Sequence, residues 1–397
     1  MHDLILHGWI AHFGDGLFAM RSLSALFGVL AIILMFPATR EVLRLAAPPL
    51  DEGEIDMIAA LSALICAVSL VTIKYSREAR MYGLLLAAVL AQVWFLLRAI
   101  RRTALSDYVV LAILTAAMVA TSLVSAPMLA TEGLWLVVIL ASRARMKSAV
   151  AAGLAIAAGV AILTPALYVL IRHGAQAVRE GKVNWLVMPP WWEPAAFFNK
   201  ATGSVAFPVM AALAIWGLWR GWTGARAALG FALLWMWAPP VLLLIGSHVW
   251  RPMFVERYAL YAFPAFFVLI AFGIWQLPGE AARAVAAAVV VALALSHIHS
   301  YWQKPHDSDW HEAARVATAS LRPDGTVAVA PGWAVEVVRY YMIPAAREHA
   351  VRYFDATDAT RVLVMSDSLM RGTGAAQLRS EYPHLLAHPR GVVVLAR

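Results

Sequence analysis

The chain has 397 residues, of which 62% are hydrophobic and only 14% are charged. Soluble proteins carry about 25% charged residues, and this chain also gathers its apolar residues into long runs, which indicates a polytopic membrane protein. The formal net charge of +8 does not indicate nucleic-acid binding, because the basic residues lie in short loops between apolar runs. The single cysteine, Cys66, excludes an intramolecular disulfide and argues against a thiolate metal site.

Residues 1–18 form the first segment, which we expect to lie on the membrane surface. Leu4, Trp9 and Phe13 belong to an apolar pattern typical of an interfacial amphipathic helix. The segment has no basic region ahead of an apolar core, so it does not resemble a cleavable signal peptide.

Residues 19–300 are predicted to be a transmembrane domain. Apolar runs separated by turn residues such as Ala47-Pro48-Pro49 and Leu277-Pro278-Gly279 indicate about ten spanning helices. The predicted spans are 19–38, 55–73, 80–97, 107–122, 125–141, 148–171, 203–219, 226–246, 257–277 and 281–298.

The basic residues of the loops fall into two groups that alternate along the chain, and so lie on opposite sides of the membrane. The first group forms clusters with few acids among them: Arg40, Arg44, Arg98, Arg101, Arg102, Arg143, Arg145, Lys147, Arg220, Arg226 and Arg283. The second is mixed with acids and aromatic residues: Lys74, Arg77, Arg80, Arg172, Arg179, Lys182, Lys200, Arg251 and Arg257. We place the first group in the cytoplasm, so residue 1 and the C-terminal segment lie outside.

The sequence pattern of residues 301–397 is typical of a small water-soluble α/β domain. Strands are predicted at 327–330, 361–365 and 392–395, with helices at 334–342 and 374–381. Asp309 and Glu312 have the spacing of a capping box ahead of a further helix. The predicted fold class is thus an all-α polytopic membrane protein with a small C-terminal α/β domain, which we expect to be extracytoplasmic.

The first candidate site is the charged stretch Tyr75-Ser76-Arg77-Glu78-Ala79-Arg80-Met81-Tyr82. A continuous helix over 55–98 would be about twice the ~30 Å hydrocarbon core, so the chain is predicted to reverse near 74–79. Ser76 is expected to cap the next helix, and Arg77 and Arg80 would then have the wrong sign for its first turn, which favours an anion site. The alternative is boundary arginines that reach water and pair with Glu78.

A second charged stretch lies on the same predicted side of the membrane. It contains His248-Val249-Trp250-Arg251 and then Glu256-Arg257-Tyr258, and Arg257 is expected to open a helix. The candidate binding residues here are Arg251, Arg257 and Tyr258, which together with the first site would bracket a phosphate or diphosphate. The alternative is an interfacial loop with a Glu256–Arg257 pair.

Two other stretches have simpler explanations than a functional site. The outer loop 172–202 contains Trp185, Trp191 and Trp192, and membrane anchoring explains these tryptophans better than sugar stacking. The acidic and histidine residues of 306–311 are better explained by a helix cap than by a metal site.

The residues quoted above resemble a known family. The stretch Tyr75 to Leu84 is similar to the signature S-[RQ]-E-A-R-x-Y-x-L of bacterial membrane glycosyltransferases with the GT-C fold, in the family 39-like group related to protein mannosyltransferases and aminoarabinose transferases. Weaker similarities cover nearly the whole chain: Phe13-Gly14-Asp15 with Arg21, Ser24 to Gly28, Arg257-Tyr258-Ala259-Leu260 with Phe263-Pro264-Ala265, and Asp309-Trp310.

The resemblance implies an enzyme of the bacterial inner membrane that transfers a hexosyl or pentosyl group. The donor would be a polyprenyl-phosphate-linked sugar, and the acceptor a hydroxyl of a glycan, lipid or protein on the extracytoplasmic side. Arg77, Arg80 and Arg257 would hold the departing lipid phosphate, with Glu78 and Tyr82 positioning them. The sequence identifies no cofactor and leaves metal dependence and oligomeric state open.

The chain departs from the family pattern at its start. In the family, a first span and a loop with a catalytic aspartate precede the segment that begins here near residue 4, so the expected base lies upstream of residue 1. A misplaced start, a fragment and a loss of activity all account for this departure. The rival hypothesis is therefore a non-catalytic subunit that binds or assembles lipid-linked sugars. A transporter would need ionisable residues in mid-span, and the predicted spans are almost free of them.

Overall fold

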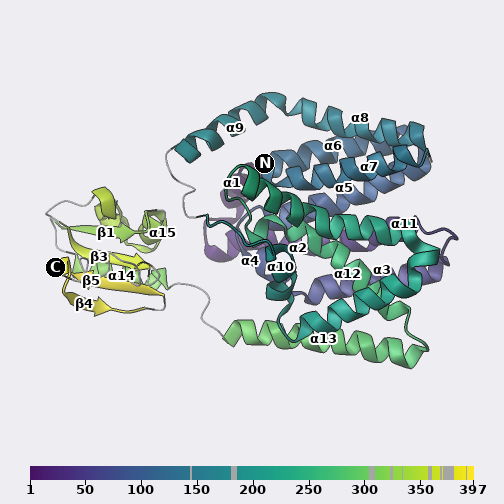
Figure 1. The fold of residues 1–397 in the computed structure, drawn as a ribbon. Coiled ribbons are helices and arrows are strands. Elements are labelled where there is room, and N and C mark those ends of the chain that lie inside the picture. Colours follow the sequence, from purple (N-terminus) through teal and green to yellow (C-terminus); the bar gives the residue numbers. More distant parts are fainter. Residues whose placement is uncertain are drawn as a thin grey trace. The chain divides into compact units, whose positions relative to one another are not determined.

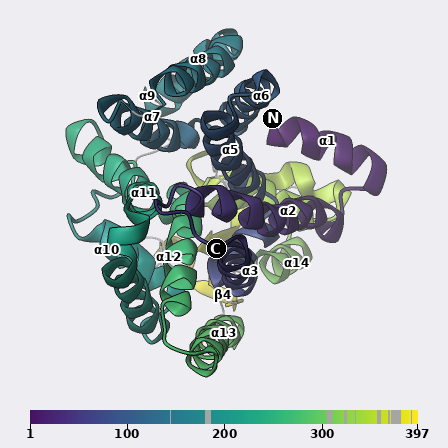
Figure 2. The ribbon, with the colours of Figure 1, turned by 90° about the vertical axis from the view of Figure 1, so that its right-hand side faces the viewer.

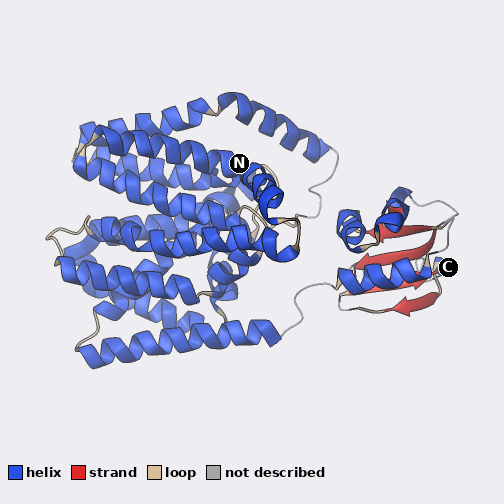
Figure 3. Ribbon diagram, turned by 180° about the vertical axis from the view of Figure 1, so that it is seen from behind, coloured by secondary structure: helices blue, strands red, loops and turns tan. Residues whose placement is uncertain are grey.

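The computed structural model describes residues 1–143, 145–179, 186–303, 309–321, 325–332, 334–355, 360–366, 369, 380–389 and 391–397. The chain divides into two compact units, Met1–Ile298 and His299–Arg397. The first unit is helical and the second contains a β-sheet (Figures 1 and 3). The predicted fold class, a polytopic all-α membrane protein with a small C-terminal α/β domain, is confirmed.

Each predicted span falls on a helix or a pair of helices. The helices are α1 His2–Phe13, α2 Leu17–Leu43, α3 Glu52–Val68, α4 Leu70–Arg77, α5 Tyr82–Arg102, α6 Leu105–Thr121, α7 Ala126–Ala141, α8 Met146–Ile162, α9 Thr164–Arg179, α10 Glu193–Thr202, α11 Ala206–Val249, α12 Phe263–Trp275 and α13 Glu280–Gln303. Within the described residues, five helical stretches are long and apolar enough to cross a membrane, and the bent pair α3–α4 makes a sixth.

One predicted span has a break that the hydropathy pattern does not reveal. The run 55–73 breaks at Ser69, where α3 and α4 meet at an angle of 55°. The spans 203–219 and 226–246 both fall within α11, and the break predicted between them is present as a kink. Ala225 has non-helical dihedral angles there (φ −126°, ψ 24°), so the element consists of two helices joined by a kink.

The core of the helical unit is built around α5 and α12. Nearly every residue of these two helices is buried, and α12 is a continuous apolar stretch. An end-on view shows α12 inside the bundle and α8, α9 and α13 at its periphery (Figure 2). The peripheral helices leave apolar side chains exposed, such as Leu154 and Val285, as expected for surfaces that face lipid.

One buried polar cluster lies between α5, α6 and α7. The Gln92 amide Nε2 donates to Thr115 Oγ1 at 2.8 Å and to Glu132 Oε2 at 3.2 Å, and all three residues are fully buried. Gln92 Oε1 and Glu132 Oε1 are buried with no hydrogen-bond partner in the described structure. The expectation that the spans are almost free of ionisable residues therefore has an exception at Glu132.

We expect Glu132→Gln to keep or raise the melting temperature of the detergent-solubilised protein, whereas Glu132→Ala lowers it. A glutamine keeps the shape, removes a carboxylate that is costly to bury, and adds a donor for Gln92 Oε1. Glu132→Ala removes one of the two acceptors of the Gln92 amide and leaves one of its N–H groups buried without a partner, at a cost of about 1–3 kcal/mol. A marked loss of stability in Glu132→Gln would contradict this interpretation and indicate that the charge itself is required.

The second unit has a five-stranded sheet with the order β2-β1-β3-β5-β4. Its strands are β1 Thr326–Ala330, β2 Ala350–Arg352, β3 Thr360–Ser366, β4 His384–Ala387 and β5 Val392–Ala396. The pairs β1–β2 and β1–β3 are parallel, whereas β3–β5 and β4–β5 are antiparallel. The helices α14 Trp310–Ser320 and α15 Ala334–Tyr341 belong to the same unit.

The predicted strands correspond to β1, β3 and β5, whereas β2 and β4 were not predicted. Asp309 caps α14 as expected, because its Oδ1 accepts from the Glu312 backbone N–H at 3.0 Å. Most of the predicted helix 374–381, and residues 306–308 of the histidine-containing stretch, lie outside the described residues.

Candidate functional site

The first charged stretch forms the tight connection between α4 and α5. Helix α4 ends at Arg77 and α5 begins at Tyr82, so the chain reverses over 78–81. The Arg80 backbone N–H donates to the Glu78 carbonyl at 2.7 Å. The predicted capping role of Ser76 is wrong, because Ser76 lies inside α4. Arg77 occupies the last turn of α4, where positive charge is favourable, so the argument from unfavourable charge placement does not apply to it.

Helix α2 holds this connection in place through two close approaches. A Cβ on Gly28 would overlap the Ser76 side chain, and a Cβ on Gly83 would lie 2.8 Å from the Ser24 carbonyl oxygen. The Ser24 hydroxyl also donates to the Arg80 carbonyl at 3.3 Å. Two segments that the sequence linked only by family resemblance, 24–28 and 76–83, are therefore in direct contact.

The two charged stretches meet at a pair of tyrosines. The rings of Tyr75 and Tyr82 pack edge to face with centroids 5.3 Å apart. Arg80, Arg257 and Tyr258 all lie close enough to Tyr82 to interact with it electrostatically. The structure thus brings Arg80, Tyr82, Arg257 and Tyr258 together from distant parts of the chain.

The acidic residues of both stretches lie near the same tyrosine pair. Glu78 and Glu256 are both within electrostatic range of the Tyr75 hydroxyl, as is Arg257. Glu256 to Tyr258 form a 3₁₀ turn, and α12 begins only at Phe263. Arg257 therefore does not open a helix as predicted. Its guanidinium lies over the Tyr258 ring, 5.6 Å from the centroid.

Arg251 is separate from this cluster. Its guanidinium lies over the Trp250 ring at 5.1 Å. Its Nε and Nη1 are buried without a hydrogen-bond partner among the described residues. In the same part of the chain, no hydrogen bond, ion pair or ring contact joins Arg251 to the α4–α5 connection. Arg251 is thus a predicted binding residue that the structure does not place with the tyrosine pair.

The segment that leads into α10 contacts the second charged stretch. The Lys200 ammonium lies 2.6 Å from Glu193 Oε1 and 3.7 Å from Glu256 Oε1. Trp191 stacks on His248 with ring centroids 3.8 Å apart. The hydrogen bond that Lys200 donates to Glu193 and the charges of both glutamates raise the pKa of Lys200 above its ordinary value.

Sequence reasoning missed these partners. It assigned the tryptophans of the loop 172–202 to membrane anchoring and gave no role to His248 or Lys200. The only available signal was the mixture of acids and aromatic residues in that loop. Trp185 lies outside the described residues.

Arg77 faces a groove rather than the tyrosine pair. The groove has a volume of about 600 Å³, and its lining residues are Leu17, Phe18, Arg21, Ser22, Ala25, Leu26, Val29 and Arg77. Two guanidiniums thus share one groove with an apolar strip of α2, in which Leu26 and Val29 are more than half exposed. Such a groove can accept an anionic group attached to an apolar chain.

The described residues contain no group of three or more histidine, cysteine or acidic side chains placed to hold a metal ion. The chemistry available in the described cluster is that of guanidiniums, an ammonium, carboxylates and phenols. Guanidinium forks with neighbouring phenols suit the oxygens of a phosphate group.

The chain was compared with known families, curated proteins and solved structures. No family model matches it, and no curated protein matches it. The crystal structure of ArnT from Cupriavidus metallidurans in the apo state matches with 15% identity and a TM-score of 0.61, over 100% of this chain and 86% of that one. The structure of ArnT from the same organism bound to undecaprenyl phosphate matches with 14% identity and a TM-score of 0.59, over 100% and 87%. The predicted GT-C fold is therefore confirmed along the whole of this chain.

Proposed function

We propose that this chain is a membrane glycosyltransferase that takes a sugar from a polyprenyl-phosphate donor and passes it to an acceptor hydroxyl. One observation carries the proposal: Arg80 and Arg257, far apart in the sequence, both lie within electrostatic range of Tyr82 in a chain with the fold of ArnT, a protein that has been solved with undecaprenyl phosphate bound. The reaction would take place on the extracytoplasmic side of the bacterial inner membrane, where we also place residues 301–397.

The charge change in the reaction explains why guanidiniums are needed. A polyprenyl-phosphate sugar is a phosphodiester with one negative charge. When the acceptor oxygen bonds to the anomeric carbon, the bond from that carbon to the phosphate oxygen breaks, the hydroxyl proton of the acceptor is released to water, and the phosphate leaves with a second negative charge. Arg80 and Arg257 would stabilise this added charge, so they bind the transition state more tightly than the substrate.

The groove with Arg21 and Arg77 supports a lipid substrate. Its apolar strip along α2 suits the first isoprene units, while its two guanidiniums can attract the phosphate to the membrane boundary. We assign no catalytic base within the described residues. Glu193 and Glu256 flank the Lys200 ammonium, which favours a role in positioning over proton abstraction.

The test is transfer and binding by the full chain reconstituted in liposomes. Radiolabelled polyprenyl-phosphate sugars would be offered with glycan, lipid and protein acceptors, and the release of polyprenyl phosphate would be measured. We expect saturable binding of the donor and release that depends on the acceptor. Binding without transfer would support the rival subunit that only binds or assembles lipid-linked sugars. No binding of any polyprenyl phosphate would contradict both functions.

The proposed sidedness has a separate test, because the native Cys66 is buried. Single cysteines at Trp192 and Arg102, both exposed, would be labelled with a membrane-impermeant maleimide in intact cells and in inverted vesicles. We expect labelling of Trp192→Cys from outside and of Arg102→Cys from the cytoplasm. The reverse pattern would place the candidate site on the wrong side for the proposed reaction.

A further inference from the structure

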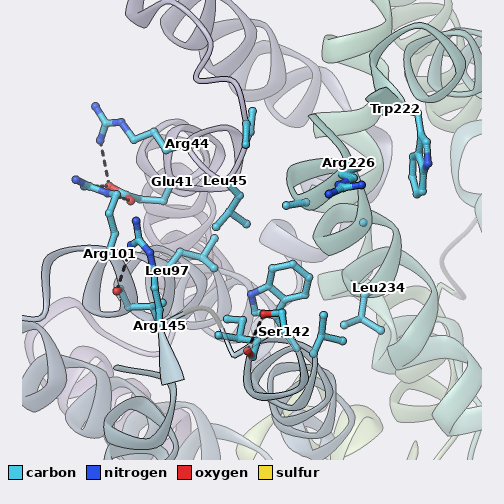
Figure 4. Close-up of a pocket in the computed structure, with 18 residues that line it drawn as sticks. Glu41, Arg44, Leu45, Leu97, Arg101, Ser142, Arg145, Trp222, Arg226 and Leu234 are labelled. Atoms are coloured by element: carbon cyan, nitrogen blue, oxygen red, sulfur yellow. Dashed lines mark hydrogen bonds and ion pairs between the residues drawn. The ribbon is translucent and has the colours of Figure 1, made fainter. Parts of the chain in front are cut away.

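A second pocket lies at the opposite end of the helices that form the candidate site. It has a volume of about 750 Å³ (Figure 4). Helix α5 begins with Tyr82 at the candidate site and reaches this pocket at Arg101, about 30 Å away at 1.5 Å per residue. Helix α2 likewise contacts the candidate site at Ser24 and lines the pocket at Glu41. The two sites are thus separated by about the thickness of a membrane.

The pocket collects arginines from four separate places in the chain. Arg44 follows α2, Arg101 lies in the last turn of α5, Arg145 precedes α8 and Arg226 follows the kink of α11. The pocket lining contains a single acid, Glu41. All four arginines belong to the group that the sequence places in the cytoplasm. Topology alone requires that these arginines reach water, and it does not require that they share a pocket.

Two of these arginines are paired with carboxylates. The Glu41 carboxylate is 3% exposed and accepts from Arg101 Nε at 2.9 Å and Nη2 at 2.7 Å. Arg44 Nη1 also donates to Glu41, at 3.1 Å, and its Nη2 donates to Glu52 at 2.7 Å. This cluster lies on one side of the pocket, and Arg226 lies on the other (Figure 4).

The other two arginines of the pocket have no carboxylate partner among the described residues. Arg145 donates one hydrogen bond, from Nη1 to the Ile100 carbonyl at 3.3 Å. Arg226 has no hydrogen bond or ion pair with any described residue. The Trp135 side chain lines the pocket and is more than nine-tenths buried, and its Nε1–H has no partner in the described structure. An unpartnered buried donor beside two uncompensated guanidiniums indicates an anionic ligand.

The walls of the pocket indicate that the ligand also has an apolar part. Apart from the charged groups, they consist mainly of apolar side chains that include Leu45, Leu97, Val138, Ile139 and Leu234. Trp222 is 47% exposed at the same site, and tryptophan is typical of the level of lipid headgroups. A free anion would leave these apolar walls without a partner, whereas a lipid would fill them with its acyl chains.

We propose that this pocket binds an anionic phospholipid of the membrane, with its headgroup phosphate between Arg145 and Arg226. The Trp135 indole N–H supplies a further donor, and the acyl chains lie along the apolar wall. The Glu41 cluster fixes Arg44 and Arg101, so that the positive charge available to the lipid comes from the other two arginines. The binding of a phospholipid here does not depend on the proposed transfer reaction, and it would stand if that reaction were disproved.

The test compares two pairs of substitutions in the full chain. Arg145→Gln with Arg226→Gln removes the two uncompensated charges. Lys147→Gln with Arg220→Gln removes the same total charge from the same two regions without touching the pocket lining. Each protein would be purified from nanodiscs that contain equal amounts of phosphatidylglycerol and phosphatidylcholine, and the retained lipids would be counted by native mass spectrometry.

We expect the wild-type chain and the control pair to retain phosphatidylglycerol, and the pocket pair to bind it about tenfold more weakly, because charge-assisted hydrogen bonds are lost. Equal retention by all three proteins, or equal retention of phosphatidylcholine, would overturn the proposal.

A second measurement needs no variant and so does not depend on the folding of one. We expect phosphatidylglycerol added to the wild-type protein in detergent to raise its melting temperature, while phosphatidylcholine and inorganic phosphate leave it unchanged. An equal rise with inorganic phosphate would assign the pocket to free anions. A rise in melting temperature with undecaprenyl phosphate but not with phosphatidylglycerol would assign the pocket to the lipid carrier. Either result would overturn the phospholipid assignment.

Discussion

Arg257→Gln is expected to lower the rate of sugar transfer by about 100-fold or more while the protein still inserts and binds its donor. Removing one group that stabilises the charge of the transition state costs about 2.7–4 kcal/mol in enzymes that have been measured. Arg80→Gln should have a similar effect, because both guanidiniums lie within electrostatic range of Tyr82. The measurement is kcat and KM for transfer from a radiolabelled polyprenyl-phosphate sugar.

Arg251 and Arg102 supply the controls for this prediction. Arg251→Gln removes a guanidinium from the same loop, but its described contact is with Trp250, so we expect a smaller loss of rate than for Arg257→Gln. Arg102→Gln changes an exposed residue at the other end of α5 and should leave transfer unchanged. If both Arg80→Gln and Arg257→Gln transferred sugar at the wild-type rate, the assignment of this site would be wrong.

Gly28→Ala is expected to lower both the melting temperature and the rate of transfer, because its methyl group would overlap the Ser76 side chain. Overpacking of this kind costs about 1–3 kcal/mol. Here it would also displace the end of α4 that leads to Arg77 and Arg80. Ser76→Gly removes the obstructing side chain, so the double variant Gly28→Ala/Ser76→Gly should recover much of both properties. Differential scanning fluorimetry and the transfer assay would measure them.

Gly133→Ala is the matched control for Gly28→Ala. It also adds one methyl group to a helix, but nothing lies within 4 Å of the new position, and alanine favours a helix over glycine. We expect a melting temperature equal to or above that of the wild type. If Gly28→Ala behaved like Gly133→Ala, the contact between α2 and α4 would not support the site.

Features that depend on neighbouring residues could be predicted from the sequence, whereas features that depend on long-range packing could not. The spans were predictable because the length and composition of an apolar run are local properties, and a helix that crosses a membrane needs about 20 such residues. The α4–α5 connection was found for a related reason, since charge between two apolar runs stands out in the sequence. The bend at Ser69 was not found, whereas the kink at Ala225 falls in the break predicted between the spans 203–219 and 226–246.

The predicted capping role of Ser76 shows where local reasoning fails. Serine is a common N-cap residue, but packing of Ser76 against Gly28 of α2 extends α4 to Arg77. Propensity is a weak prior that a tertiary contact can override. The predicted position of Arg77 in the first turn of a helix was wrong for this reason, and Arg257 lies in a 3₁₀ turn ahead of α12.

The sequence by itself determined the class of this protein, the approximate positions of its spans and the charged stretches at which they reverse, because all of these follow from neighbouring residues. Only the tertiary structure decided which side chains meet. It brought Arg257 within electrostatic range of Tyr82 and Lys200 close to Glu256, left Arg251 apart, and gathered four arginines and the buried Glu41 around one pocket. Such contacts depend on how helices pack across long separations in the chain, and no local pattern encodes that packing.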